Sequence, residues 1–179
     1  MTLDEIKAVV AEAEPVIRRL VETVHERPAS ACVTYAQIAS PILHHMGVRN
    51  SIIAGRALWR VAPADDAVVH HVPEMGDCVV SGDFPYHCWL MTLEGYVIDY
   101  TTKHLAEKLA MVAEYDNKSS ECLWTEPFLV RHQKELLDPA GVIKRNECDA
   151  AYGPIGGMAE HYGITPALLD VILIPGVGD

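Results

Sequence analysis

The chain has 179 residues, half of them apolar, and a formal net charge of −11 at pH 7. This size predicts one domain spanning residues 1–179, and the charge argues against nucleic acid or an anionic membrane surface as a partner. No apolar run approaches the ~20 residues that a membrane-spanning helix needs, and the charged first segment does not resemble a signal peptide. Five cysteines, none in a CxxC pair, predict a reduced, cytoplasmic protein.

Two helices are predicted in the first third of the chain. Residues 3–25 place apolar side chains on one broad stripe, and Pro15 is expected to bend that helix. A second apolar repeat with helical spacing covers residues 32–46 and stops at Gly47, a common C-terminal residue of helices. Pro41 removes one backbone hydrogen bond, so we expect a bend there rather than a second element.

Cys32 begins the second of these helices, with Ser30 as the expected N-cap. The first turn of a helix has unpaired N–H groups and the positive end of the helix dipole, which both favour a thiolate. A single buried cysteine is most often just a small apolar residue. The interpretation of Cys32 as a nucleophile therefore depends on which side chains lie beside it.

Four β-strands are predicted next. Residues 51–61 and 67–72 are rich in β-branched side chains and are joined by a Pro-containing turn. Residues 86–92 and 96–101 flank Leu93-Glu94-Gly95, which predicts a β-hairpin, because a three-residue loop ending in Gly is a common connection.

The loop length fixes the pairing register of this hairpin. Counting outward from the loop pairs Leu90 with Ile98 and Trp89 with Asp99. His87 then shares a face with Asp99 as a diagonal neighbour, roughly 7–8 Å away at the backbone, so the two side chains can meet. A two-residue turn would instead place Asp99 opposite Leu90, on the other face from His87.

The remaining chain predicts organisation but little chemistry. A helix is expected from Thr101 or Thr102 to about Tyr115, and residues 123–130 favour an edge strand because of Pro127. Residues 153–157 (GPIGG) suggest a flexible connector. Thr165-Pro166 is typical of the start of a short helix, which we expect to continue through Leu173.

Cys32, His87 and Asp99 together form the candidate catalytic set. In this order they suit a thiol nucleophile, its general base and the residue that orients the base. Trp89 is predicted on the same face as His87, where it would shield the imidazole from water; a plain core aromatic is the alternative. Cys88 points to the opposite face and is expected to be a core residue.

Several short motifs carry a family resemblance. They are the Cys32 helix ending in Met46-Gly47-Val48-Arg49, then IIAGRA at 52–57, His87-Cys88-Trp89, and IDYT at 98–101. Their order resembles the transglutaminase-like branch of the papain-like cysteine peptidase superfamily, in particular its uncharacterised bacterial families. The resemblance covers residues 30–101. It implies an α+β fold, with the Cys-bearing helix packed on a mainly antiparallel sheet, and the roles given above for the three residues.

Two features depart from the pattern of that superfamily. Papain-like peptidases have a Gln six residues before the Cys that helps to form the oxyanion hole, whereas this chain has Glu26, whose charge would repel an oxyanion. The Arg and Gly that precede the Cys in arylamine acetyltransferases are absent, since residues 27–31 read RPASA. That particular activity is therefore disfavoured.

Two classes of function remain. The first is a thiol-dependent acyl-transfer enzyme, a hydrolase or acyltransferase, acting on a peptide or a small amide or ester through an acyl-enzyme. The second is an inactive peptidase-like binding module, which Glu26 favours most; a redox role of a low-pKa Cys32 is a smaller third alternative. The catalytic scheme requires no cofactor, and the sequence does not specify an oligomeric state.

A metal site is the weaker interpretation of the histidine content. The chain has nine histidines, including the pair His70-His71, but adjacent residues of a strand point to opposite faces. A zinc site could still combine one of them with Cys78 or His87. The spacing matches no zinc motif, so we expect no metal.

Overall fold

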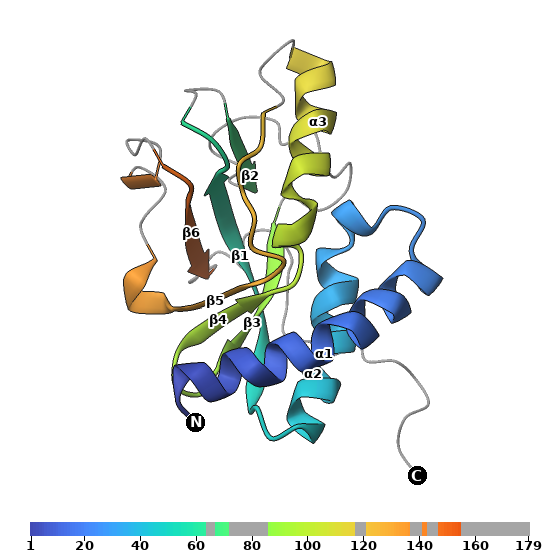
Figure 1. The fold of residues 1–179 in the computed structure, drawn as a ribbon, viewed down its shortest axis with the longest axis vertical. Helices are drawn as coiled ribbons and strands as arrows, with labels where there is room; N and C mark the ends of the chain where they lie inside the picture. Colours follow the sequence, from blue (N-terminus) through green and yellow to red (C-terminus); the bar gives the residue numbers. More distant parts are fainter. Residues whose placement is uncertain (64–66, 72–85, 117–120, 137–140, 143–146, 155–179) are drawn as a thin grey trace, which may run out of the picture.

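The chain folds as an α+β structure, in which helices pack on a curled antiparallel sheet (Figure 1). This computed structural model describes residues 1–63, 67–71, 86–116, 121–136, 141–142 and 147–154. The α+β class and the antiparallel sheet confirm the coarse prediction from sequence. The predicted short helix at 165–173 lies outside the described residues, and no described helix is long and apolar enough to cross a membrane.

Helix α1 (Leu3–Val24) follows the predicted apolar stripe. It begins with a capping box, in which the Thr2 side chain accepts from the Glu5 N–H and the Glu5 side chain accepts from the Thr2 N–H. The buried side chains repeat at helical spacing: Ile6, Val10, Ala13, Ile17 and Val21. The helix is continuous through Pro15. Leu20 and Val24, which the stripe includes, are exposed at its C-terminal end.

The N-cap of helix α2 (Cys32–His45) lies one residue later than expected. Ala31 holds the N-cap position without a side-chain bond, because Ser30 belongs to a 3₁₀ turn (Pro28–Ser30) and its hydroxyl donates to the Arg27 carbonyl. The prediction of Ser30 as N-cap was therefore wrong. Helix α2 continues as one element through Pro41, as expected.

Gly47 ends α2 as the sequence predicts. Its φ is +88°, a conformation that glycine adopts without strain. The Gly47 N–H donates to the His44 carbonyl at 3.0 Å, and the Val48 N–H donates to the Leu43 carbonyl at 2.8 Å. These two bonds make the Schellman motif that satisfies the last carbonyls of a helix.

The described strands form one six-stranded antiparallel sheet in which β1 is central. The strands are β1 (Asn50–Arg60), β2 (Val68–His71), β3 (His87–Thr92), β4 (Tyr96–Asp99), β5 (Leu129–His132) and β6 (Asp149–Pro154). Strand β1 pairs with β2, β3 and β6, and the sheet continues from β3 through β4 to β5. The sequence predicted an edge strand at 123–130; β5 lies at the edge, but only Leu129 and Val130 fall within the predicted range. It missed β6, and the flexible connector assigned to 153–157 was wrong for Gly153 and Pro154, which end that strand.

Strands β2 and β3 lie end to end along the same side of β1. Ala57 pairs with His71 on β2 and also with β6, while Gly55 pairs with His87 on β3 and also with β6. A strand residue has one partner on each side, so β6 occupies one side of β1, and β2 and β3 share the other. His71 and His87 are thus placed like residues i and i+2 of one strand, with side chains on the same face.

The β3–β4 hairpin has the predicted register. Leu90 pairs with Ile98 and Met91 with Val97, and the three-residue loop closes with a bond from the Gly95 N–H to the Thr92 carbonyl at 3.0 Å. Gly95 has a φ of +88°, as the loop type requires. The two-residue turn, which would have separated Asp99 from His87, does not form.

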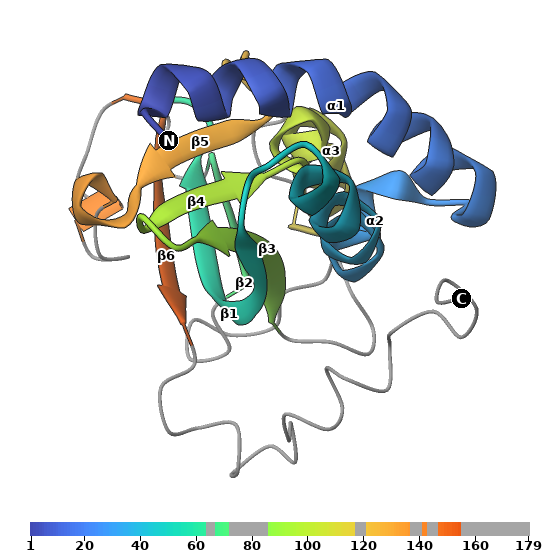
Figure 2. The same ribbon diagram turned by 90° about the horizontal axis from the view of Figure 1, so that it is seen from below.

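Two apolar clusters cover the two faces of the sheet. On one face, α1 and α2 pack on alternate residues of β3 and β4 that include Cys88, Leu90 and Ile98. Figure 2 shows α1 lying across the sheet near β4 and β5, with α2 beside β3. On the other face, Leu105 and Leu109 of α3 (Leu105–Asp116) pack in a cluster with side chains of β1 and β3. A 3₁₀ turn, Thr102–His104, precedes α3, close to the predicted helix start.

Candidate active site

The side chains of His87 and Asp99 meet as the hairpin register predicts. His87 begins β3, Asp99 ends β4, and His87 Nε2 donates to Asp99 Oδ2 at 2.8 Å. Both side chains are buried. Burial lowers the pKa of His87, but the charge and hydrogen bond of Asp99, together with Cys32, outweigh burial and raise the pKa overall. The imidazole is therefore oriented by a carboxylate that also stabilises its protonated form.

Hydrogen bonds from both sides hold the Asp99 carboxylate in place. The Tyr152 hydroxyl donates to Oδ2 at 2.7 Å, and the N–H and hydroxyl of Thr101 both donate to Oδ1 at 2.8 Å. Burial raises the pKa of Asp99, but the charge and hydrogen bond of His87, with Lys108 and Tyr152, more than offset it and keep the pKa well below its usual range. Asp99 is therefore ionised at neutral pH.

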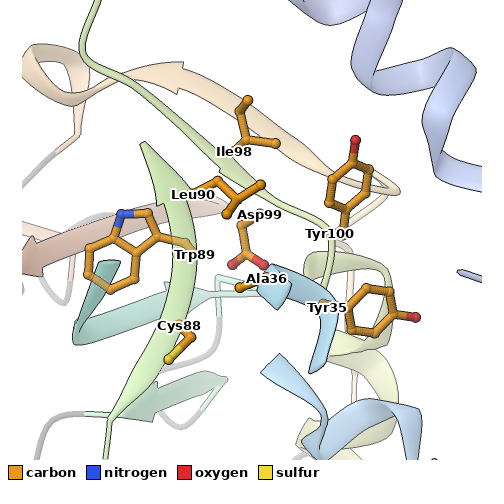
Figure 3. A pocket seen from close by; sticks show the side chains of 8 residues that line it. All are labelled: Tyr35, Ala36, Cys88, Trp89, Leu90, Ile98, Asp99 and Tyr100. Carbon is orange, nitrogen blue, oxygen red and sulfur yellow. The ribbon is translucent and has the colours of Figure 1, made fainter. Parts of the chain in front are cut away.

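A small internal cavity lies next to the Asp99 side chain, between α2 and β3. Figure 3 shows Asp99 pointing into the space between α2 and β3, with Ala36 beside it. The cavity volume is about 10 Å³, which leaves room for one water molecule at most. This space therefore belongs to the packing that supports Asp99 and has no room for a substrate.

Cys32 lies where the first turn of α2 meets the start of β3. Its side chain contacts Cys88 and His87 and is 6% exposed. A hydrogen bond from Cys88 lowers the pKa of Cys32, burial raises it, and His87 and the charge of Lys108 lower it further, so the pKa lies well below its usual value. Cys88 is the buried core residue that the sequence predicted; its contact with the Cys32 thiol was not predicted.

The second ring nitrogen of His87 is the one available to the thiol. Asp99 occupies Nε2, and the buried Nδ1 has no hydrogen-bond partner among the described residues. Cys32 interacts with the ring, but the two make no hydrogen bond of standard geometry. Catalytic contacts in ligand-free sites are often long and shorten when the substrate binds. The three predicted residues are thus adjacent in the predicted order.

Aromatic rings enclose the imidazole of His87. Trp89 stacks beside it with ring centroids 6.1 Å apart and planes at 19°, and Trp59 meets it edge-on at 4.9 Å. Trp89 thus lies on the same face as His87, as the hairpin register predicts. Trp89 is 1% exposed, and Figure 3 shows its indole extending from β3 away from the space between α2 and β3. This position is compatible both with shielding of the His87 ring from water and with a plain core role.

A pocket with a volume of about 50 Å³ opens beside Cys32. It is lined by Ala29, Ser30, Cys32, Val33, His71, Tyr86 and Lys108. Glu26 does not line this pocket; it is exposed and lines an adjoining surface hollow, which shares Ser30 with the Cys32 pocket. The structure therefore places the Glu26 carboxylate outside the Cys32 pocket, contrary to the expectation that it occupies the oxyanion position.

Four residues of this site were not predicted as site residues. Tyr152 lies on β6, a strand that the sequence analysis did not predict. Trp59 lies in the strand predicted at 51–61, but nothing in that pattern assigns it to a site. Lys108 is a polar position in a helix by sequence, yet it is 1% exposed and its Nζ lies 5.1 Å from the ring centroid of Trp59. His71 entered the sequence analysis only as a metal candidate. No local pattern could have assigned any of the four to this site.

The structure does not bring together a metal-binding cluster in its described part. No group of three or more His, Cys, Asp or Glu side chains among these residues is arranged to hold an ion. Cys78, one member of the metal set considered from sequence, lies outside the described residues. His71 and His87 lie close, with ring centroids 5.3 Å apart, but Asp99 holds the Nε2 of His87.

Comparisons with known proteins give a family and a fold. A family model described as "Protein of unknown function (DUF2026)" matches residues 14–122, a span that contains Cys32, His87 and Asp99. No curated protein matches the chain. The chain is similar to one solved structure, "The crystal structure of genomics APC5867", with a TM-score of 0.55 and 15% sequence identity over 95% of this chain and 75% of that chain. This likeness concerns the fold alone and agrees with the α+β class.

Proposed function

The chain belongs to the DUF2026 family, and we propose that it is a thiol-dependent acyl-transfer enzyme of the transglutaminase-like type. The observation that carries this proposal is the position of Cys32 at the start of α2, beside an imidazole that Asp99 holds at 2.8 Å. Nucleophile, base and orienting carboxylate in contact are the parts that acyl transfer through an acyl-enzyme requires.

The chemistry follows from the protonation states of the pair. His87 takes the thiol proton, and the Cys32 thiolate attacks the carbonyl carbon of an amide or ester to form a tetrahedral intermediate. When this collapses, the carbon–nitrogen or carbon–oxygen bond breaks, and His87 returns its proton to the leaving amine or alcohol. Water or an amine, deprotonated by His87, then attacks the thioester and releases Cys32.

The environment of the pair supports charge separation before the substrate arrives. The pKa of His87 is raised and that of Cys32 is lowered, which favours the imidazolium–thiolate state. The α2 N-terminus and the charge of Lys108 also favour the thiolate. A binding module would gain nothing from an activated thiol, so these pKa shifts favour the enzyme over the binding module.

The test is the pH dependence of Cys32 alkylation by iodoacetamide, with mass spectrometry to assign the modified cysteine. We expect Cys32 to react well below the free-thiol pKa of ~8.5 and His87→Ala to abolish that low-pH reactivity. Cys32→Ser controls for the other thiols, and circular dichroism checks that each variant is folded. An inert Cys32, or one that titrates near 8.5 or above, would instead support the inactive binding module.

A further inference from the structure

A second histidine beside Cys32 has unused hydrogen-bonding capacity. His71 is 3% exposed, and neither of its ring nitrogens has a hydrogen-bond partner in the described part of the chain. Burying a polar group without a partner costs free energy, so such groups are rare in folded proteins and often have a function. The His71 imidazole can therefore donate a hydrogen bond to a bound molecule.

The fold places His71 against the reacting groups. Because β2 and β3 share one side of β1, His71 lies next to His87 on the same face, with ring centroids 5.3 Å apart. His71 also lines the same 50 Å³ pocket as Cys32. A substrate carbonyl that reaches the Cys32 sulfur through this pocket brings its oxygen into the region that His71 lines.

His71 is a neutral donor at physiological pH. Burial lowers its pKa well below the usual value, and the positive charges of Lys108 and His87 lower it further. Either neutral tautomer has one N–H group. A neutral imidazole can therefore donate to an oxygen atom without competing with His87 for the proton of Cys32.

The rest of the pocket suits a developing negative charge. Cys32 is the first residue of α2, and the first N–H groups of a helix have no partner within the helix. Lys108 adds a positive charge to the same pocket. The Glu26 carboxylate, which would oppose an oxyanion, lines a different hollow.

We propose that the His71 N–H, together with the backbone N–H of Cys32, forms the oxyanion hole of this site and replaces the side-chain donor that papain-like peptidases place before the cysteine. This assignment rests on the proposed function. It gives His71 a direct contact with the substrate oxygen in the tetrahedral intermediate, where a preorganised donor contributes most.

Comparing two reactions of the Cys32 sulfur shows whether His71 acts as an oxyanion donor or affects the reactivity of the thiolate in general. Acylation by p-nitrophenyl acetate forms a thioester, releases p-nitrophenolate and passes through an oxyanion. Alkylation by iodoacetamide displaces iodide at a saturated carbon and forms none. The acylation and alkylation rates of Cys32 are measured on the full chain at pH 7, with mass spectrometry to confirm the modified residue.

We expect His71→Phe to slow acylation by about 10²-fold or more while alkylation changes by less than about threefold. His71→Gln keeps an N–H donor and should recover part of the acylation rate. His45→Phe, at an exposed position near the end of α2, is the matched control and should leave both rates unchanged.

The other outcomes overturn the proposal in distinguishable ways. Equal losses of acylation and alkylation in His71→Phe and His71→Gln would mean that His71 acts by packing around the thiolate. Unchanged acylation in both variants would exclude His71 as the donor while leaving the proposed function intact. A wild-type Cys32 that reacts with neither reagent would overturn the proposed function and the oxyanion hole together.

Discussion

Cys32 and Cys88 show how two buried thiols acquire opposite properties. The pKa of Cys88 is raised, first by its hydrogen bond to Cys32 and then by burial and the nearby charges. Cys88 therefore stays protonated and donates to the Cys32 sulfur, whose pKa is lowered. The side chain that the sequence marks as ordinary core thus contributes to the reactivity of the nucleophile.

Replacing Cys88 should consequently raise the pKa of Cys32. Cys88→Ala removes the S–H donor, so the onset of iodoacetamide alkylation at Cys32 is expected to move to higher pH. Cys88→Ser restores a donor and should shift the onset less. Cys122→Ala, at a half-buried position outside the Cys32 pocket, serves as the control, and an identical onset in Cys88→Ala and wild type would exclude the S–H donation.

At the scale of elements, two glycines set the ends of the segments that carry the site. Gly47 ends α2 and Gly95 closes the β3–β4 hairpin, both with a φ of +88°. A Cβ at Gly47 would have open space, whereas one at Gly95 would lie 2.9 Å from Gln133 Nε2. Because that atom is the end of an exposed, flexible side chain that can move away, the conformation of the backbone dominates at both positions.

Gly47→Ala and Gly95→Ala are therefore each expected to lower the free energy of unfolding by about 1–2 kcal/mol, the cost of a left-handed conformation for an L-residue. Gly47→Asn should lose less, because Asn tolerates this conformation. Urea unfolding at pH 7 measures the three values. An unchanged free energy of unfolding in Gly47→Ala would contradict the conformational argument. A much larger decrease in Gly95→Ala than in Gly47→Ala would show that the Gln133 side chain cannot move away.

Elements with local signals were predictable and elements with distant partners were not. The hairpin register followed from the length of its loop, and it alone brought His87 and Asp99 together. The end of α2 followed from Gly47. Strand β6 has no local signal beyond a short apolar run, because its partner β1 lies about ninety residues earlier in the chain. The Tyr152 bond to Asp99 was hidden for the same reason.

The same distinction between local and distant signals applies to the residues of the candidate site. Its three central residues were found because a helix start and one hairpin define them. The side chains around them come from β1, β2, β6 and α3 and converge only in the folded molecule. His71 is the clearest case: its place beside His87 depends on two strands meeting end to end along β1, which no sequence period encodes.

The stability of the whole molecule should depend on pH through histidines that are buried or partly buried in their neutral form. His104 joins the turn before α3 to α2, with its Nε2 2.9 Å from the Tyr35 hydroxyl. Burial lowers its pKa to about 4, with Lys103 and Lys108 adding to the effect. Glu107 lies 3.5 Å from its Nδ1, but this contact is exposed on the Glu107 side and does not offset burial.

The sign of the His104 contribution follows from where protons bind. In the unfolded chain a histidine titrates near 6.5, so between pH 6.5 and about 4 the unfolded state binds more protons than the folded state. The stability contribution of neutral His104 is therefore complete above pH 6.5 and falls as the pH drops to about 4, by an amount on the order of 1–3 kcal/mol. His71 changes in the same direction, while the raised pKa of His87 opposes both.

Comparing His104→Gln with wild type isolates this contribution, because the other titrating groups are common to both proteins. The introduced glutamine keeps a polar partner for Tyr35 but does not titrate, so the difference in unfolding free energy between pH 7 and pH 4.5 should be smaller in the variant. Urea unfolding at the two pH values measures it, with His45→Gln as an exposed control. Parallel pH profiles in wild type and His104→Gln would mean that His104 is protonated in the folded protein, through Glu107, and that burial does not control its charge.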